Sequence, residues 1–208
     1  GVVLGVLRIE REPVEAAKLL RVVQPDMPVL DDYLRLWIGE SLLKQNEPIQ
    51  AAELLETIPK IVPDSSLIAK AAYRTGEAWY SANVCFRAVE WLERAVALAD
   101  KDAAAPSALW HQAECHIREN RLPEARTALK QLWLRYPHSP EAREAKARLD
   151  TALGGESWTP TAEDHSIRAQ AFLGLAMQAE AVEELRRFLA MAPGHPRRFD
   201  ARLKLGVA

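Results

Sequence analysis

Histidine and cysteine, which bind metals and act as nucleophiles, number five and two in this sequence, and their spacing suits neither role. The nearest histidine pair, His111 and His116, is five residues apart. Two histidines on a helix reach one metal ion when they are four apart, so this pair misses the required spacing. The sequence also contains no glycine-rich phosphate loop and no nucleophile elbow. We therefore expect no catalytic residue, no metal and no cofactor.

The two cysteines, Cys85 and Cys115, fall on different predicted helices. Two cysteines are too few for a disulfide scaffold or a four-cysteine zinc site. We expect both to be buried packing residues. A disulfide between neighbouring repeats stays open as an alternative in an oxidising compartment.

A more specific pattern comes from glutamates that recur at a fixed stride. Glu40, Glu77 and Glu114 are each 37 residues apart (77 − 40 = 114 − 77 = 37). Apolar or aromatic residues lie four before and three after each glutamate. They are Leu36, Tyr73 and Trp110 before, and Leu43, Tyr80 and Ile117 after. Spacings of three and four place each triplet on one face of a helix.

Two interpretations of these nine residues stay open. In the first, they form a face that holds an extended peptide or a partner helix through charge and apolar anchors. In the second, each glutamate pairs with a nearby arginine, such as Arg74 or Arg118, and the aromatic side chains fill the seams between repeats.

The elements that must position these residues form an internal repeat. A small residue recurs at Ala51, Ala88 and Ala125 (88 − 51 = 125 − 88 = 37). Twelve residues before each lies another small residue, and seven after each lies an apolar one. The earlier set is Gly39, Gly76 and Ala113, and the later set is Ile58, Ala95 and Leu132. Because Ala, Leu, Glu and Arg favour helices, this pattern predicts antiparallel helix pairs that cross at their small residues.

Further copies and breaks in the register set the expected boundaries. A fourth copy lies around Ala181, and a damaged first copy lies around Ala16. The step from Ala125 to Ala181 is 56 instead of 37, which leaves residues 141–153 as a helix without an obvious partner. We expect repeats over 1–153, a linker or bend over 154–163, and a further repeat of the same solenoid over 164–208. Two roles for the linker stay open. It permits a bend in the solenoid, or its Trp158 packs back onto a helix. Most prolines mark helix ends or first turns, and Pro59 is expected to kink or end its helix.

Composition excludes several broad classes. The 208 residues carry 27 Lys and Arg against 29 Asp and Glu, a formal net charge of −2, so a general nucleic-acid binder is not expected. No apolar run reaches the roughly 18 residues needed to cross a bilayer. The apolar stretch of residues 1–7 is too short to read as a targeting signal.

The repeat resembles the tetratricopeptide repeat, with units about three residues longer than the usual 34. The resemblance covers roughly residues 10–200 and implies an all-α, right-handed superhelix of antiparallel helix pairs, a TPR-like solenoid. In that family the first helix of each pair lines the concave groove. The resemblance therefore places Leu36, Glu40, Leu43 and their equivalents in the groove.

A narrower resemblance comes from the turn Leu132-Trp-Leu-Arg-Tyr-Pro-His-Ser-Pro-Glu-Ala142. It looks like a recurring turn in the helical region of bacterial soluble lytic transglycosylases, which cleave peptidoglycan in the periplasm. Similar turns occur in repeat proteins of the cell envelope, including outer-membrane assembly and Tol–Pal-associated factors. The catalytic Glu-Ser stretch of the transglycosylases is not matched here. Glu40-Ser41 and Glu156-Ser157 both lack the residues that follow it in that family.

These resemblances lead to two functional expectations. The first is a non-catalytic interaction or scaffold module, the helical part of a lytic transglycosylase, which binds a protein or peptide, an attached catalytic domain or peptidoglycan. The alternative is a stand-alone envelope adaptor. Hydrolase activity in this chain itself is the least favoured hypothesis. Both leading expectations imply a periplasmic or cell-envelope location.

Overall fold

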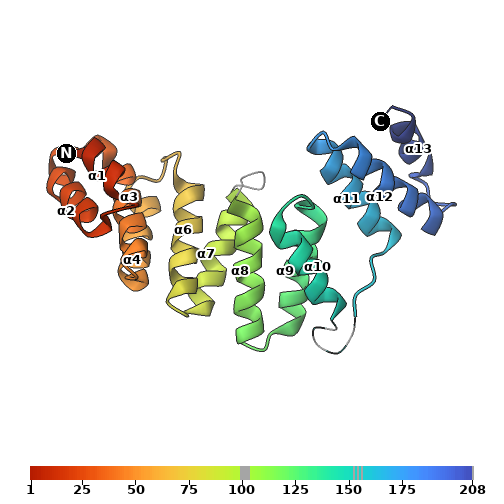
Figure 1. The fold of residues 1–208 in the computed structure, drawn as a ribbon, viewed down its shortest axis with the longest axis horizontal. Coiled ribbons are helices and arrows are strands. Elements are labelled where there is room, and N and C mark those ends of the chain that lie inside the picture. Colours follow the sequence, from red (N-terminus) through yellow and green to blue (C-terminus); the bar gives the residue numbers. More distant parts are fainter. Residues whose placement is uncertain (99–103, 152, 154, 156, 208) are drawn as a thin grey trace. The chain divides into compact units, whose positions relative to one another are not determined.

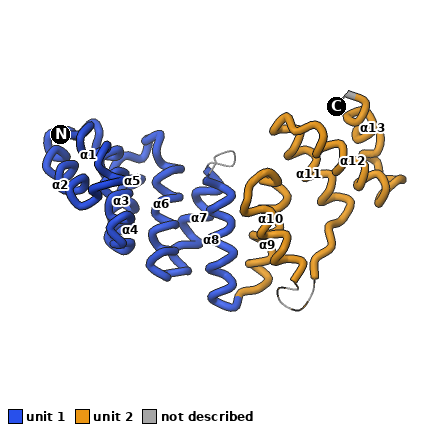
Figure 2. The backbone as a smooth tube through the Cα atoms, in the orientation of Figure 1, with its two compact units in different colours: residues 1–120 blue, residues 121–208 orange. Residues whose placement is uncertain are grey.

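The computed structural model describes residues 1–98, 104–151, 153, 155 and 157–207, and every regular element within these ranges is helical (Figure 1). The predicted all-α class is therefore confirmed. The chain has two compact units, Gly1–Asn120 and Arg121–Ala208 (Figure 2). The expected linker over 154–163 lies inside the second unit and stays a prediction. Its residues Gly154 and Glu156 are outside the described ranges.

Unit 1 consists of short helices. In chain order they are α1 (Val2–Arg8), α2 (Pro13–Val23), the 3-10 turns η1 (Gln24–Asp26) and η2 (Pro28–Leu30), α3 (Asp31–Lys44), α4 (Pro48–Leu55), α5 (Ile58–Ile61), α6 (Ile68–Ser81), α7 (Cys85–Leu98) and α8 (Ala104–Arg118). Helices α1 and α2, α3 and α4, and α6 and α7 pack as consecutive pairs. We call α3, α6 and α8 the A helices and α4 and α7 the B helices.

The small residues lie at the helix crossings, as predicted. A Cβ atom on Gly39 would lie 2.6 Å from Cδ2 of Leu55, and one on Gly76 would lie 2.6 Å from Cγ of Leu92. Ala51 and Ala88 are fully buried in the core of the unit. The crossing predicted for Ala113 with Ala125 would join residues of different units and stays a prediction.

The turns between paired helices share one backbone conformation. Asn46, Asn83 and Asn120 have φ values of 61°, 58° and 56°, and Ala176 in unit 2 has 57°. Asparagine tolerates this left-handed region better than other residues that carry a Cβ atom. At the end of α3, the Glu47 amide donates a hydrogen bond to the Leu42 carbonyl at 3.0 Å, and the Asn46 amide donates one to the Leu43 carbonyl at 3.0 Å. This pairing is a Schellman motif, which satisfies the last carbonyls of α3.

Pro59 has the expected effect on its helix. The B helix of this repeat stops at Leu55, and a separate single turn, α5, starts at Ile58 with Pro59 in its first turn. Proline has no amide hydrogen to donate, so it suits the first turn of a helix and not its interior.

Unit 2 contains α9 (Leu122–Arg135), α10 (Pro140–Asp150), α11 (Ala162–Gly174), α12 (Gln178–Met191) and α13 (Arg198–Val207). Helix α9 packs against both α10 and α11, and α11 pairs with α12. Helix α11 begins with a capping box, in which Thr161 accepts from the Asp164 amide and Asp164 accepts from the Thr161 amide. Its first turn carries Glu163 and Asp164, acidic residues that a helix N-terminus favours.

Trp158 docks onto the helices before it, as the sequence allowed. Its ring lies 5.1 Å from the ring of Trp133 in an edge-to-face arrangement, and its amide donates to the Leu149 carbonyl at 3.0 Å. The ammonium groups of Lys130 and Lys146 lie 5.3 and 5.9 Å from the ring centre. Trp158 is only 8% exposed, so its side chain is a buried aromatic contact of unit 2.

Candidate interaction surface

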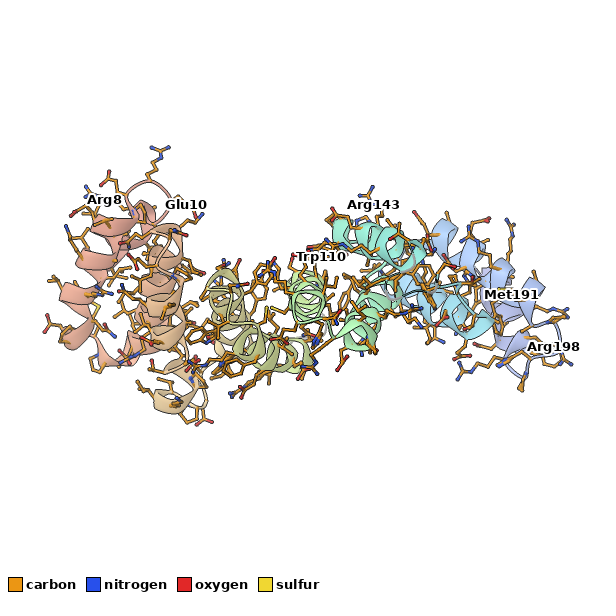
Figure 3. All side chains as sticks on the ribbon, turned by 90° about the horizontal axis from the view of Figure 1, so that it is seen from below. Arg8, Glu10, Trp110, Arg143, Met191 and Arg198 are labelled. Atoms are coloured by element: carbon orange, nitrogen blue, oxygen red, sulfur yellow. The ribbon has the colours of Figure 1, made fainter. Side chains whose placement is uncertain are left out.

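The predicted site residues all lie on the A helices of unit 1. Eight of them are half-buried, and we call this set the A-helix face: Glu40, Leu43, Tyr73, Glu77, Tyr80, Trp110, Glu114 and Ile117. Figure 3 shows Trp110 at the upper edge of α8. The ninth predicted residue, Leu36, is 1% exposed and packs with Leu55, Ile58 and Ala71. Leu36 is therefore a core residue and not a surface contact, because the bulky side chains of α4 and α5 cover it.

The carboxylates of Glu40 and Glu77 are paired within the unit. Arg74 Nε lies 3.3 Å from Glu40 Oε1, and Arg74 Nη1 lies 2.7 Å from Glu77 Oε2. Lys70 Nζ adds a second contact to Glu40 at 3.1 Å. Burial opposes the charge of Arg74, but the hydrogen bond and charge of Glu77 raise its pKa overall. Glu40 of α3 is thus paired with two cations of α6, and Glu77 with an arginine of its own helix.

Glu114 is engaged by a tyrosine. The Tyr80 hydroxyl donates to Glu114 Oε2 at 2.5 Å. Burial, followed by this hydrogen bond and the charge of Glu114, raises the pKa of Tyr80 to about 12. The Tyr80 ring stacks on His111, with 4.2 Å between ring centres, and Arg118 lies 4.3 Å from the Tyr80 ring centre. Tyr80 of α6 therefore contacts three residues of α8, through its hydroxyl group and both its stacking and cation contacts.

These contacts favour the second interpretation of the carboxylate row. Arg74 pairs with two of the glutamates, as that interpretation expected, although Glu114 also uses a tyrosine. The repeat spacing did not point to the contact of Lys70 with Glu40 or to the stacking of His111 on Tyr80. Arg74 and Glu77 are three residues apart, a spacing that predicts an ion pair on one face of a helix. What the face offers a ligand is a set of half-exposed aromatic and apolar side chains on a charge-balanced surface.

Two buried acids elsewhere hold helices together. The Trp79 indole N–H donates to Glu56 Oε1 at 2.7 Å, and Arg87 Nη2 lies 2.8 Å from the same oxygen. In unit 2, Glu184 contacts His165 Nδ1 at 2.6 Å and Arg168 Nε at 3.0 Å. Because a buried charge needs a partner, these groups tie the helices that carry them.

Neither cysteines nor histidines form a metal centre in the part of the chain that the structure describes. No group of three or more His, Cys, Asp or Glu side chains gathers there in a way that could hold an ion. Cys85 and Cys115 are buried free thiols, as the packing interpretation expected. Within the described ranges, no helix combines the length and apolar character needed to cross a bilayer.

Comparison with known proteins agrees with this architecture. Residues 87–149 match the tetratricopeptide repeat family. The structure of MamA from AMB-1 is similar over 96% of this chain and 93% of that one, with 16% identity and a TM-score of 0.55. A Podosopora anserina protein named as a kinesin light chain with nearly identical TPR-like repeats is similar over 93% of this chain and 94% of that one, with 17% identity and a TM-score of 0.55. No curated protein sequence matches the chain.

The fold therefore defines a helical-repeat protein of the solenoid class. Within that class the chain has a tetratricopeptide-repeat-like fold, and its residues 87–149 match that repeat in sequence as well.

Proposed function

We propose that this chain is a non-catalytic scaffold whose A-helix face binds an extended peptide or a helix of a partner protein. The observation that carries the proposal is the half-exposure of Tyr73, Tyr80 and Trp110 on consecutive A helices. Aromatic rings that are already fixed in place supply a large contact area and lose little conformational entropy on binding. Because the glutamates are paired internally, apolar and aromatic contacts dominate recognition here.

Selection of peptides from a random displayed library tests this role. We expect the wild-type chain to enrich a consistent set of peptides, and the double variant Tyr73→Ala, Trp110→Ala to lose at least about ten-fold in affinity for them. Val22→Ala is the matched control, because Val22 is 74% exposed on α2, outside the face. Unchanged affinity in the double variant would contradict the assignment of the A-helix face.

We further propose that the chain is the helical part of a peptidoglycan lytic transglycosylase of the periplasm or cell envelope. The support is the turn from Leu132 to Ala142. Tyr136 follows the last residue of α9, Pro140 lies in the first turn of α10, and the Ser139 hydroxyl accepts from the Ala142 amide at 3.1 Å. Such an N-cap stabilises a helix by about 1 kcal/mol. A stand-alone envelope adaptor is the second candidate, because the same turn would serve it equally.

The full reading frame separates these candidates, and an activity assay tests the non-catalytic character that both share. A lysozyme-like domain encoded in the same reading frame would support the transglycosylase, and a repeat-only reading frame would support the adaptor. Incubation of the chain with purified peptidoglycan tests the non-catalytic part of the proposal. We expect no release of muropeptides above the buffer control, and release that depends on the folded chain would contradict it.

A further inference from the structure

A second surface of unit 1 carries a repeated pair of side chains on the B helices. Ile49 and Glu53 of α4 occupy the same repeat positions as Phe86 and Glu90 of α7 (86 − 49 = 90 − 53 = 37). Ile49 is 51% exposed and Phe86 is 68% exposed, and both glutamates are exposed. A single exposed apolar residue is ordinary, but here an apolar residue and an acid recur together one helical turn apart. We call these four residues, with Glu93 of α7, the B-helix strip.

The structure links the two helices of this strip. Arg87 of α7 reaches Glu56, the residue after α4, with 2.8 Å between Nη2 and Oε1, and its guanidinium lies 4.0 Å from the Trp79 ring centre. Arg87 is thereby paired with a buried acid. Arg94, the other arginine of α7, lies over the Trp91 ring at 5.2 Å.

The acids of the strip differ from those of the A-helix face in their pairing. Among the described residues, the side chains of Glu53, Glu90 and Glu93 form no hydrogen bond or ion pair, whereas Glu40, Glu77 and Glu114 are all engaged. Of these six acids, the three without a partner therefore lie on the B helices. The same helices carry the exposed Ile49 and Phe86, and this combination defines the chemistry of a complementary ligand.

We propose that the B-helix strip binds a basic amphipathic helix of a partner protein. Such a helix presents an apolar stripe with lysine or arginine along its edges. Its apolar side chains would cover Ile49 and Phe86, and its cations would pair with Glu53, Glu90 and Glu93. This surface is separate from the A-helix face and gives the scaffold a second binding function.

A synthetic amphipathic peptide of about 18 leucine and lysine residues is the probe, since about this length is needed for a stable helix in water. Binding to the intact chain is followed by fluorescence anisotropy. We expect the wild-type chain to bind this peptide, and the affinity to fall as salt is raised. A peptide in which every lysine is replaced by glutamate should bind at least about ten-fold more weakly.

Substitutions then locate the binding. Phe86→Ser and the double variant Glu53→Lys, Glu90→Lys should each weaken binding by about ten-fold or more, and these exposed positions leave the helical circular dichroism signal unchanged. Glu180→Lys, at an exposed glutamate of α12, is the matched charge control and should change the affinity less than about two-fold. The A-helix variant Tyr73→Ala, Trp110→Ala should retain binding, which separates this test from that of the proposed function.

Three results would overturn the proposal. They are the absence of binding to the leucine-lysine peptide, equal binding to its glutamate counterpart, and a loss of affinity in Glu180→Lys as large as that in the double glutamate variant.

Discussion

Leu55 of α4 packs so closely over Gly39 of α3 that a Cβ atom on the glycine would lie 2.6 Å from the leucine Cδ2 atom. Leu92 covers Gly76 in the same way one repeat later, and Leu20 covers Gly5 one repeat earlier, where the Cβ distance would be 2.8 Å. Each glycine allows its helix pair to approach closely, and each leucine fills the space that the missing side chain leaves. This contact is what positions the A helices and hence the proposed binding face.

Gly76→Val should therefore destabilise unit 1 by about 2 kcal/mol or more, because an overpacked helix crossing forces backbone shifts. Urea denaturation followed by circular dichroism measures the change. Gly174→Ala is the matched control, since nothing lies within 4 Å of the position a Cβ atom would take there. We expect it to leave stability unchanged or to raise it by about 1 kcal/mol at most. Equal losses in both variants would show that the close crossing is not the cause.

Ala176 has the left-handed backbone that asparagine adopts in the equivalent turns of unit 1, with φ of 57°. Alanine is strained in this region, whereas glycine is not. Ala176→Gly should stabilise the protein by about 1 kcal/mol, measured as a higher midpoint in thermal or urea unfolding. Ala179→Gly, inside α12, should instead destabilise it by about 0.5–1 kcal/mol. A loss of stability in Ala176→Gly would contradict the turn geometry.

Tyr80 should ionise at a higher pH than ordinary tyrosines do, because its pKa is raised to about 12. Because folding raises this pKa above the unfolded value of about 10, the stabilising contribution of the neutral phenol is complete below pH 10. It is lost as pH rises toward 12. Absorbance titration of tyrosinate should show a late transition that disappears in Tyr80→Phe and moves to lower pH in Glu114→Gln. A titration with no late tyrosine would rule out the Tyr80–Glu114 contact.

The cysteines should react slowly with thiol reagents in the folded chain. Burial, reinforced by the hydrogen bond and charge of Cys85, raises the pKa of the Cys115 thiol, so little thiolate is present at neutral pH. We expect a colorimetric disulfide reagent to label both residues slowly in buffer and rapidly in denaturant. Rapid labelling of the native chain, with Cys115→Ser identifying the reactive residue, would contradict their burial.

Trp158 should be essential for the packing of unit 2, since it fills the space beside Trp133 and is 8% exposed. Trp158→Ala should cost about 3–5 kcal/mol, and Trp158→Phe should cost less, because a smaller ring keeps part of the contact. Leu175→Ala, at a position 52% exposed, should change stability by less than about 0.5 kcal/mol. A small loss in Trp158→Ala would show that this residue does not anchor the segment.

The helix pairs could be predicted from sequence because small residues recur every 37 residues. The position of α1 and the conformation of the turns were not predicted from that spacing. Helix α1 lies within the range expected for repeats, but its bounds did not follow from the 37-residue register, because the step from Gly5 to Gly39 is 34. The turns at Asn46, Asn83 and Asn120 share that register (83 − 46 = 120 − 83 = 37), so their left-handed conformation was available as a signal and was overlooked.

The candidate site was less predictable than the fold. Leu36, Tyr73 and Trp110 share a register position, yet only Leu36 is fully buried, since the size of the neighbouring side chains decides burial and not the register. Likewise, spacing placed the glutamates on one face and indicated the Arg74–Glu77 pair, but it did not reveal that Arg74 also reaches Glu40 or that Tyr80 binds Glu114. These last two contacts join different helices, so they depend on the distance between helices, which sequence spacing does not encode.

Hydrogen–deuterium exchange of the chain with and without a library-selected peptide tests the central proposal most directly. The account predicts slower exchange in α3, α6 and α8, and loss of that protection in the variant Tyr73→Ala, Trp110→Ala. Protection confined to α4 and α7 or to unit 2, with α3, α6 and α8 unchanged, would contradict it.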